Sequence, residues 1–147
     1  MRDNTRLSDA IHTIGLLYVR RADDLTSTQI AGSVNTNPVV IRRLIGDLKR
    51  AGLINSTQGG HKLDLTREPK DITVLDVYQA VDDSQLLRID TNTNQNCIIG
   101  GNIQAVLGDY YAELAAAMKA EMAKTTMADM IDKILAEADR KQAQRDA

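Results

Sequence analysis

Residues 26–51, TSTQIAGSVNTNPVVIRRLIGDLKRA, predict two helices joined by a tight polar turn. Thr26 followed by Gln29 is the pattern of a capping box, in which two side-chain oxygens accept hydrogen bonds from backbone N–H groups at the start of a helix. The Asn-Thr-Asn turn ends that first helix because short polar side chains compete for backbone hydrogen bonds. Asn37 is then a favourable N-cap for a second helix, and Pro38 suits its first position because an N–H there would have no partner inside the helix.

The second of these helices has an apolar side and a basic side. Arg42 and Arg43 fall largely outside the apolar side, and Gly52 ends the helix. A helix–turn–helix of this kind commonly places one helix in the major groove of DNA, although two arginines can also belong to a merely solvated face. The apolar residues, which recur at helical spacing and should face the core, are Ile41, Leu44, Ile45 and Leu48.

A β-hairpin is predicted directly after this pair of helices. Two short runs, residues 53–57 and 61–65, flank Gln58-Gly59-Gly60, which suits a tight turn. A hairpin in this position makes a winged helix with the loop as its wing, and the alternative is a hairpin that only closes the core. We therefore expect a mainly α fold with a small β-hairpin: a winged helix-turn-helix plus a long C-terminal dimerisation helix.

Local patterns predict the remaining short helices. Residues 6–20 form the first helix, with one apolar side. A helix over residues 72–81 follows the hairpin, where Thr73 and Asp76 have the spacing of a capping box. The same pattern at residues 126–129 begins a last helix, whose charged C-terminal end, EADRKQAQRDA, is expected to fray.

The longest helix is expected from Asn102 to about Lys124, with an apolar stripe that a small winged helix is too small to cover. We expect this stripe to pack against the same helix of a second subunit in a homodimer. The stripe consists of Ile103, Val106, Leu107, Tyr110, Leu114, Ala117 and Met118. The expected segments are a winged-helix DNA-binding domain (1–83), a loop with the single cysteine (84–101), a helical dimerisation region (102–138) and a charged tail (139–147).

The formal net charge of −2 combines two halves of opposite sign. Residues 1–70 hold 11 Lys/Arg against 7 Asp/Glu, a net charge of +4, and residues 71–147 hold 7 against 13, a net charge of −6. The basic half is therefore the candidate for binding a polyanion such as double-stranded DNA, although ordinary charge scatter is an equally good explanation of the charge alone.

Several classes of protein are disfavoured by the sequence. No apolar run approaches the roughly 20 residues of a membrane span, and the N-terminus lacks the apolar core of a signal peptide. We expect a cytoplasmic protein that is not associated with a membrane, and its one cysteine excludes an internal disulfide. The chain has no Ser-His-Asp arrangement and no phosphate loop, and His12 has no partner in sequence, so we do not expect an enzyme.

The chain resembles the Rrf-two family of bacterial transcription regulators, which includes the iron–sulfur cluster regulator, the nitric-oxide-sensing repressor and the cysteine-metabolism repressor. The resemblance extends over nearly the whole chain and implies a homodimeric winged-helix repressor that binds a double-stranded DNA operator and responds to a signal. The segments that carry it are NTNPVVIRRL (35–44), LKRAGLI (48–54), Gly59-Gly60 with Leu63, and ITVLDVYQAV (72–81).

The loop before the long helix departs from the cluster-binding members, which carry three cysteines there. This chain has only Cys97. A cluster needs about four protein ligands, and two subunits would supply two thiolates, so we expect no iron–sulfur cluster and no other cofactor. Cys97 precedes a helix start, which favours a thiolate and would suit an oxidant sensor, with a small-molecule effector as another possibility. The alternative is a small buried residue packed beside Ile98 and Ile99.

The candidate DNA contacts gather on the predicted winged helix. Val39 or Val40 could meet a thymine methyl, and arginines could contact phosphates or guanine edges. The full candidate set is Arg2, Arg6, Thr28, Asn37, Val39, Val40, Arg42, Arg43, His61 and Lys62. The alternative function is a winged-helix protein-interaction module without sequence-specific DNA binding, since such folds also serve as docking surfaces. Salt dependence separates the two, because DNA binding weakens steeply as salt rises.

Overall fold

The chain forms two compact units, each described by itself below. The structure, a computed structural model, describes residues 5–57, 59, 62–82 and 87–147. The winged-helix unit comprises Met1–Asp83 and Ala123–Ala147, and the loop–helix unit comprises Ser84–Met122. This division differs from the expected one, because the last helix belongs with the winged helix and not with the long helix that precedes it.

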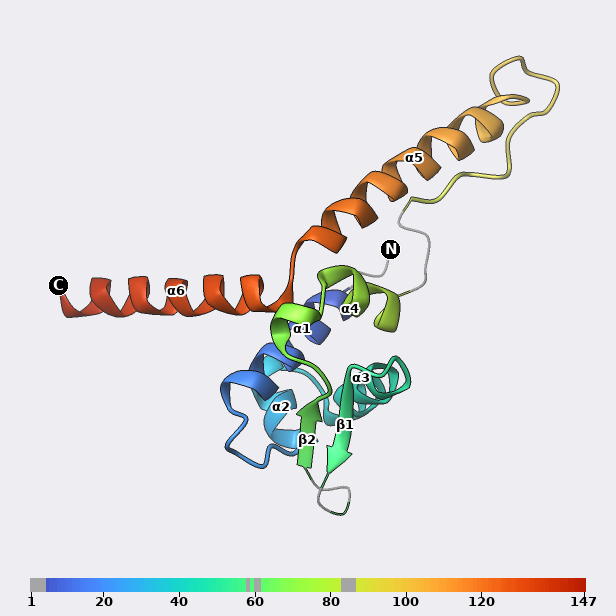
Figure 1. Cartoon of the computed structure of the whole chain (residues 1–147). Helices are drawn as coiled ribbons and strands as arrows, with labels where there is room; N and C mark the ends of the chain where they lie inside the picture. The colour runs from blue at the N-terminus through green and yellow to red at the C-terminus, as the bar shows by residue number, and fades with distance from the viewer. Residues whose placement is uncertain (1–4, 58, 60–61, 83–86) are drawn as a thin grey trace. The chain divides into compact units, whose positions relative to one another are not determined.

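The expected fold class is confirmed, and Figure 1 shows helices together with one two-stranded antiparallel sheet. Most of the elements belong to the winged-helix unit. They are α1 (Arg6–Val19), α2 (Ser27–Val34), α3 (Pro38–Arg50), β1 (Ile54–Thr57), β2 (Lys62–Leu65), the short 3-10 helix η1 (Pro69–Asp71), α4 (Val74–Val81) and α6 (Met127–Asp146). The helix of the loop–helix unit is α5 (Ile103–Lys124).

The two helices predicted from residues 26–51 form as expected, with both caps in place. The backbone N–H of Gln29 donates to the Thr26 hydroxyl over 3.2 Å, and the Thr26 N–H donates to the Gln29 side-chain oxygen over 2.9 Å. Asn35 ends α2 in the left-handed conformation, with φ of 63°. The side-chain oxygen of Asn37 accepts from the N–H of Val39 over 2.8 Å and so begins α3. Gly52, with φ of 76°, lets the chain turn away after α3.

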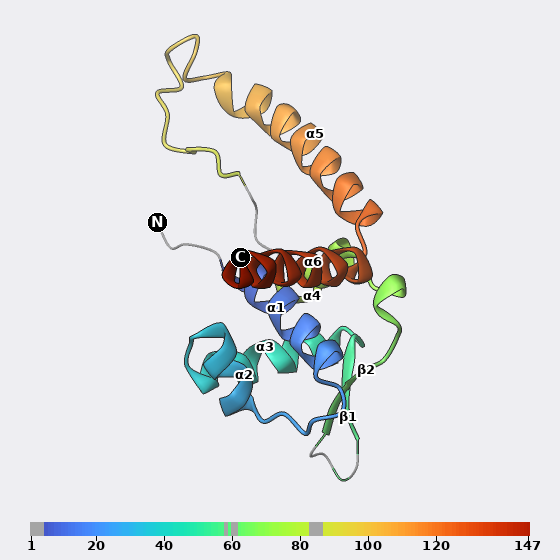
Figure 2. The ribbon, with the colours of Figure 1, turned by 90° about the vertical axis from the view of Figure 1, so that its left-hand side faces the viewer.

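The predicted hairpin forms, with β1 and β2 paired antiparallel. Ile54 lies opposite Leu65, and Thr57 lies opposite Lys62. Leu63 and Leu65 pack against the hydrophobic core, so the side of β2 that carries them faces inward. Figure 2 shows the hairpin beside α3 in the turned view.

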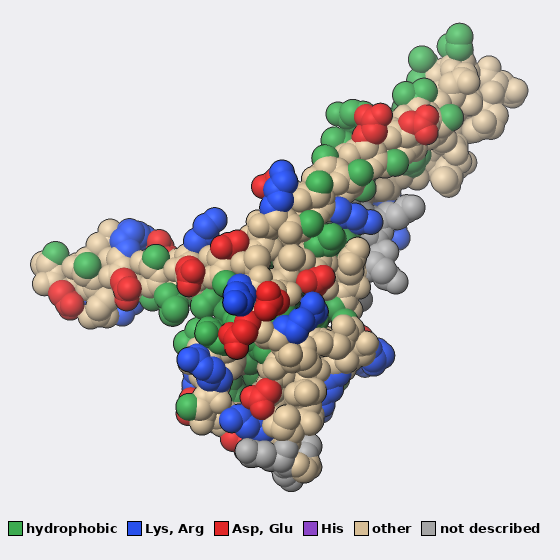
Figure 3. Space-filling view, viewed as in Figure 1, with side chains coloured by type: hydrophobic (Ala, Val, Ile, Leu, Met, Phe, Trp, Pro, Cys, Tyr) green, Lys and Arg blue, Asp and Glu red, His purple; other side chains and the backbone are tan. Residues whose placement is uncertain are grey.

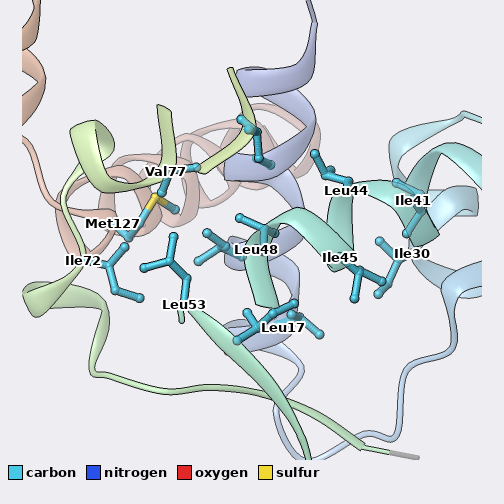
Figure 4. Packing of buried hydrophobic residues seen from close by; sticks show 14 of the residues in the cluster. Leu17, Ile30, Ile41, Leu44, Ile45, Leu48, Leu53, Ile72, Val77 and Met127 are labelled. Carbon is cyan, nitrogen blue, oxygen red and sulfur yellow. The ribbon is translucent and has the colours of Figure 1, made fainter. Parts of the chain in front are cut away.

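The core of the winged-helix unit is aliphatic, in keeping with a chain that has no Phe and no Trp. Figure 4 shows these side chains converging from helices and from the strand region. Ile14 of α1, Ile30 of α2 and Leu48 of α3 are fully buried. Burying a side chain of this size stabilises the fold by about 1.5–3 kcal/mol relative to leaving it exposed. The packing holds α3 by one side only, with Ile41, Leu44, Ile45 and Leu48 directed inward.

Helix α6 is attached to the winged helix through its first turn. The N–H of Val74 donates to the carbonyl oxygen of Thr125 over 2.8 Å, and Thr73 and Thr126 form an isolated antiparallel bridge. Met127 and Ile131 are buried in the same region. Both α4 and α6 begin with the predicted capping box. The starts of the two helices are therefore joined to each other.

The prediction that the C-terminal end frays is wrong, because α6 continues to Asp146. Its last turns are exposed but rich in good helix formers, and side-chain pairs support them. Arg140 forms an ion pair with Glu137 one turn earlier, and the Gln142 amide donates to Asp146 over 3.1 Å.

The described part of the loop–helix unit is a loop, from residue 87 onward, followed by α5. The Thr93 hydroxyl donates to the carbonyl oxygen of Gly100 over 2.6 Å, and the Gln104 side chain donates to Thr93 over 3.1 Å. A Cβ at Gly100 would lie 2.5 Å from the carbonyl oxygen of Asn94, so the loop closes only with glycine there. None of the residues of α5 is buried, and Figure 3 shows hydrophobic side chains at the surface along it. Within the described part of the chain, we find no helix with the length and apolar character that spanning a membrane demands.

Candidate nucleic-acid interface

The outward side of α3 carries apolar side chains that the fold leaves uncovered. Val39 is 45% exposed and Val40 is 40% exposed, in the first turn of the helix. The sequence left open which of the two would face outward, and both do. Branched apolar residues at the start of a helix have no role in the core here, so they are available to contact a partner such as the methyl groups of thymine.

Two exposed arginines lie beside these valines. Neither Arg42 nor Arg43 has a hydrogen bond or ion pair with any residue that the structure describes. A guanidinium without a protein partner keeps all five of its N–H donors for an external acceptor, and phosphate oxygens or the edge of guanine provide suitable acceptors. The outward side of α3 therefore combines apolar contact with hydrogen-bond donors.

Two predicted polar contacts lie near the same end of α3. Thr28 is exposed in the first turn of α2. Asn37 is also exposed, and its side-chain oxygen is occupied by the N–H of Val39. The cap leaves the NH₂ group of Asn37 as the part of that side chain that can donate outward.

Arg6, predicted from the sequence as a phosphate contact, has partners inside the winged-helix unit. Its guanidinium forms an ion pair with Asp47 of α3 and also donates to the carbonyl oxygen of Val81 in α4 over 2.8 Å. Asp47 pairs with Arg50 as well. The sequence separates these partners widely, so no local pattern indicated that Arg6 joins α1, α3 and α4 inside the winged-helix unit.

The predicted contacts of the wing are only partly within the described residues. Lys62 is half-buried at the start of β2, opposite Thr57. His61 and Arg2 lie outside the residues that the structure describes. His12 is an exposed side chain whose ring nitrogen lies 2.8 Å from the Ser33 hydroxyl, which suits a surface histidine joining α1 to α2.

Cys97 is exposed in the loop–helix unit, so the alternative that it is buried beside two isoleucines is wrong for this unit. Ile98 and Ile99 are themselves 82% and 65% exposed. The backbone N–H of Gly100, and next that of Ile99, donate to the sulfur and lower the pKa of Cys97 below that of an ordinary thiol. This geometry favours the thiolate, which is the reactive form of cysteine.

The structure also contains a groove that the sequence did not predict, between α2, α3 and the hairpin. This α2–α3–hairpin groove has a volume of about 340 Å³, and its lining includes Ser27, Arg42, Gly46, Lys49, Ser56 and Leu63. The seven-residue spacing of Arg42 and Lys49, two helical turns, was a signal available in the sequence. The position of Ser56 beside this groove could not be predicted from the sequence, because it depends on how the hairpin packs against α3.

Comparisons with known proteins identify the family of the chain. Residues 3–133 match the Rrf2 family, described as "Iron-dependent Transcriptional regulator". YwnA of Bacillus subtilis (strain 168), named as an HTH-type transcriptional regulator, is 38% identical over 131 residues, which cover 88% of this chain and 96% of YwnA.

Two solved structures are also similar to this chain. One, of a protein named as DNA-binding, is 35% identical, with a TM-score of 0.69 and coverage of 86% of this chain and 98% of that chain. A transcriptional regulator from Lactobacillus plantarum has a TM-score of 0.74 at 22% identity over 97% of each chain, which supports the fold alone. The resemblance noted from the sequence is confirmed, and the chain belongs to the Rrf2 family of transcriptional regulators, a family of regulators and not of enzymes.

Proposed function

We propose that this protein binds an operator in double-stranded DNA as a homodimer and represses transcription in response to a signal. The observation that carries the proposal is the uncovered side of α3, where Val39 and Val40 are exposed next to two arginines without a partner among the described residues. In a helix–turn–helix protein this part of the second helix contacts base edges in the major groove. We infer that such a regulator acts in the cytoplasm, where it can reach its operator.

The dimer is supported by the apolar side chains that α5 leaves exposed. Ile103, Val106, Tyr110 and Leu114 follow one another at spacings of three and four residues, and each is exposed. The same side of a second α5 would cover them in a two-fold arrangement, which is the commonest symmetry of soluble homo-oligomers. Two copies of α3 would then contact half-sites about one helical turn of DNA apart, roughly 34–36 Å.

The signal is proposed to be something other than an iron–sulfur cluster, although the family is described as iron-dependent. The donor set does not fit such a cluster, because the chain has one cysteine and the described residues contain no group of three His, Cys, Asp or Glu that could hold a metal ion. A dimer would bring two thiolates where about four ligands are needed. We propose the exposed thiol of Cys97, or a small-molecule effector, as the route for the signal.

Control of this kind needs only a modest difference in energy. A signal that changes operator affinity by a factor of about 5–150 corresponds to a coupling free energy of about 1–3 kcal/mol. Oxidation or alkylation at Cys97 would act on the loop–helix unit, and α5 leads directly to Thr125 and Thr126, which are joined to the start of α4. Helix α5 therefore connects the cysteine loop to the winged helix along the chain.

The test is a binding selection from genomic DNA with the purified full-length protein, reduced and oxidised. We expect a set of sites with two-fold symmetry, bound less tightly as salt rises, and weaker binding after oxidation. Cys97→Ser is expected to retain the resting affinity and to lose the response to oxidant. Val39→Ala with Val40→Ala is expected to reduce discrimination between operator and unrelated DNA.

Two results would count against the proposal in different ways. Recovery of no site at any salt concentration would contradict DNA binding and favour the protein-interaction alternative. An unchanged oxidant response in Cys97→Ser would leave DNA binding intact and exclude the thiol as the sensor.

A further inference from the structure

We propose that the α2–α3–hairpin groove binds one phosphate group of the DNA backbone, through Lys49 and Ser56 in addition to Arg42. The inference rests on the proposed DNA binding and adds residues to it, since neither Lys49 nor Ser56 belongs to the contacts predicted from the sequence. Three independent features of the groove carry it: its charge, an unpartnered hydroxyl and the start of α2.

The groove is cationic and has no acidic side chain in its lining. Arg42 and Lys49 line it from α3, whereas its other lining residues are neutral. Both cations are exposed, and neither has an ion pair or hydrogen bond with the described residues. By contrast, Arg50 on the same helix is paired with Asp47. Two cations beside one small groove, both free of the carboxylates that occupy Arg6 and Arg50, favour a bound anion.

Ser56 places an unsatisfied hydroxyl beside these cations. Its Oγ is buried, with less than 1 Å² exposed, and has no hydrogen-bond partner among the described residues. Buried polar groups nearly always have a partner, so an isolated hydroxyl calls for an explanation. Ser56 lines the groove. An anion in the groove would offer this hydroxyl an acceptor, since phosphate oxygens accept hydrogen bonds from serine hydroxyls.

The start of α2 supplies a third feature. Ser27, the first residue of this helix, lines the groove. The capping box uses the N–H of Gln29, whereas the N–H groups of the first two helical residues have no acceptor within a helix. Free N–H groups and the helix dipole make such an end favourable for a phosphate. The start of α2 therefore borders the same groove as Arg42 and Lys49.

Gly46 lines the groove together with the two cations. It lies four residues after Arg42 and three before Lys49, so all three are on one side of α3. A glycine inside a helix is unfavourable relative to alanine because its backbone loses more conformational freedom on folding. An added Cβ would make only an ordinary contact, 3.5 Å from a nitrogen of Arg50. The packing of the described residues therefore does not require a glycine at position 46.

The experiment compares wild type, Lys49→Gln and Ser56→Ala with Lys70→Gln as the matched control. Lys70 is an exposed lysine of η1, in the same unit but away from the groove. Fluorescence anisotropy measures binding of the full-length protein to a selected operator and to an unrelated duplex over a series of KCl concentrations. Circular dichroism melting checks that each variant is folded.

For Lys49→Gln we expect weaker binding to both duplexes alike, because a phosphate contact carries no sequence information. The slope of log affinity against log salt should decrease in magnitude by about one. Ser56→Ala should also weaken binding to both duplexes, with no change in that slope, because it removes a donor without removing a charge. Lys70→Gln should behave as wild type in both respects.

The inference is overturned if Lys49→Gln binds both duplexes as Lys70→Gln does while wild type binds DNA with a steep salt slope. Absence of DNA binding by wild type would overturn the proposed function as well, so the two failures are distinguishable. NMR titration with inorganic phosphate alone tests whether the groove binds a free anion instead of a phosphate of DNA. Shifts at the amides of Ser27 and Lys49 with phosphate, together with unchanged DNA binding by Lys49→Gln, would assign the groove to a free anion and overturn its assignment to DNA.

Discussion

The backbone N–H of Met127 donates a hydrogen bond to the carbonyl oxygen of Ile72 over 2.7 Å. This contact joins the first residue of α6 to the segment just before α4. Both side chains are fully buried. The bond lies next to the one from Val74 to Thr125, so a short two-stranded contact attaches the C-terminal helix to the winged helix.

Met127→Ala should destabilise the winged-helix unit, because it leaves a cavity where α6 meets the core. Replacing a buried methionine by alanine typically costs about 2–5 kcal/mol. Urea unfolding followed by circular dichroism measures the change. The control is Ile134→Ala, whose side chain is 52% exposed on the same helix and whose loss should change stability by no more than about 0.5 kcal/mol. Equal stability of the two variants would show that α6 is not part of the unit's core.

Asp47→Asn should destabilise the fold moderately, because Asp47 accepts from both Arg6 and Arg50. Its side chain is only 22% exposed, whereas that of Arg50 is 73% exposed. We expect a loss of about 1 kcal/mol for Asp47→Asn, and at most about 0.5 kcal/mol for Arg50→Gln, since exposed ion pairs contribute little. A double-mutant cycle between Arg6→Gln and Asp47→Asn should show non-additive free energies of unfolding. Additive free energies of unfolding would argue against an interaction between Arg6 and Asp47.

Asp129 should contribute a pH-dependent part of the stability of α6. The backbone N–H of Thr126, and next its hydroxyl, lower the pKa of the Asp129 carboxyl in the folded state. Because the folded-state pKa is depressed, this stabilisation is fully present above the unfolded pKa, about 4, and is lost as pH falls through the folded-state pKa. Unfolding free energies measured from pH 7 down to pH 3 should therefore depend less on pH in Asp129→Asn than in wild type. Asp132→Asn, which alters an exposed carboxylate outside the capping box, should retain the wild-type slope.

Cys97 should react with iodoacetamide faster in the native protein than in the unfolded chain at pH 7. The N–H groups of Gly100 and Ile99 lower the pKa of its thiol only while the loop is formed, so the thiolate fraction falls on unfolding. Mass spectrometry of quenched samples, with and without denaturant, gives both rates. A peptide of residues 94–100 provides a second unfolded reference. A native rate equal to or below these references would contradict an activated thiol.

Local patterns were sufficient to predict most helices and their ends. Thr26 with Gln29, Thr73 with Asp76 and Thr126 with Asp129 each form a capping box in the structure, because this motif involves only residues within one turn. The αL conformation of Asn35 and the N-cap at Asn37 are equally local. These signals could therefore be recognised without knowing which segments pack together.

Long-range contacts were not predictable in the same way. Nothing near Arg6 in the sequence indicates Asp47 as its partner, and arginine at a helix start is as consistent with a phosphate contact as with an internal ion pair. Similarly, the groove needs Ser56 of β1 beside Arg42 and Lys49, which follows from the packing of the hairpin. The exposure of Cys97 depends on a loop closed by Gly100 and Thr93.

The sequence by itself determined the helix–turn–helix, the hairpin, the apolar stripe of α5 and the family, because each depends on spacing within a segment. Only the tertiary structure decided that α6 belongs to the winged helix, that Arg6 is held by Asp47, and that Lys49 lies in a groove with an unpartnered serine hydroxyl. The physical reason is that hydrogen bonds and ion pairs select partners by distance in space. Residues such as Ile72 and Met127 come together only when the buried apolar surface of several elements is packed at once.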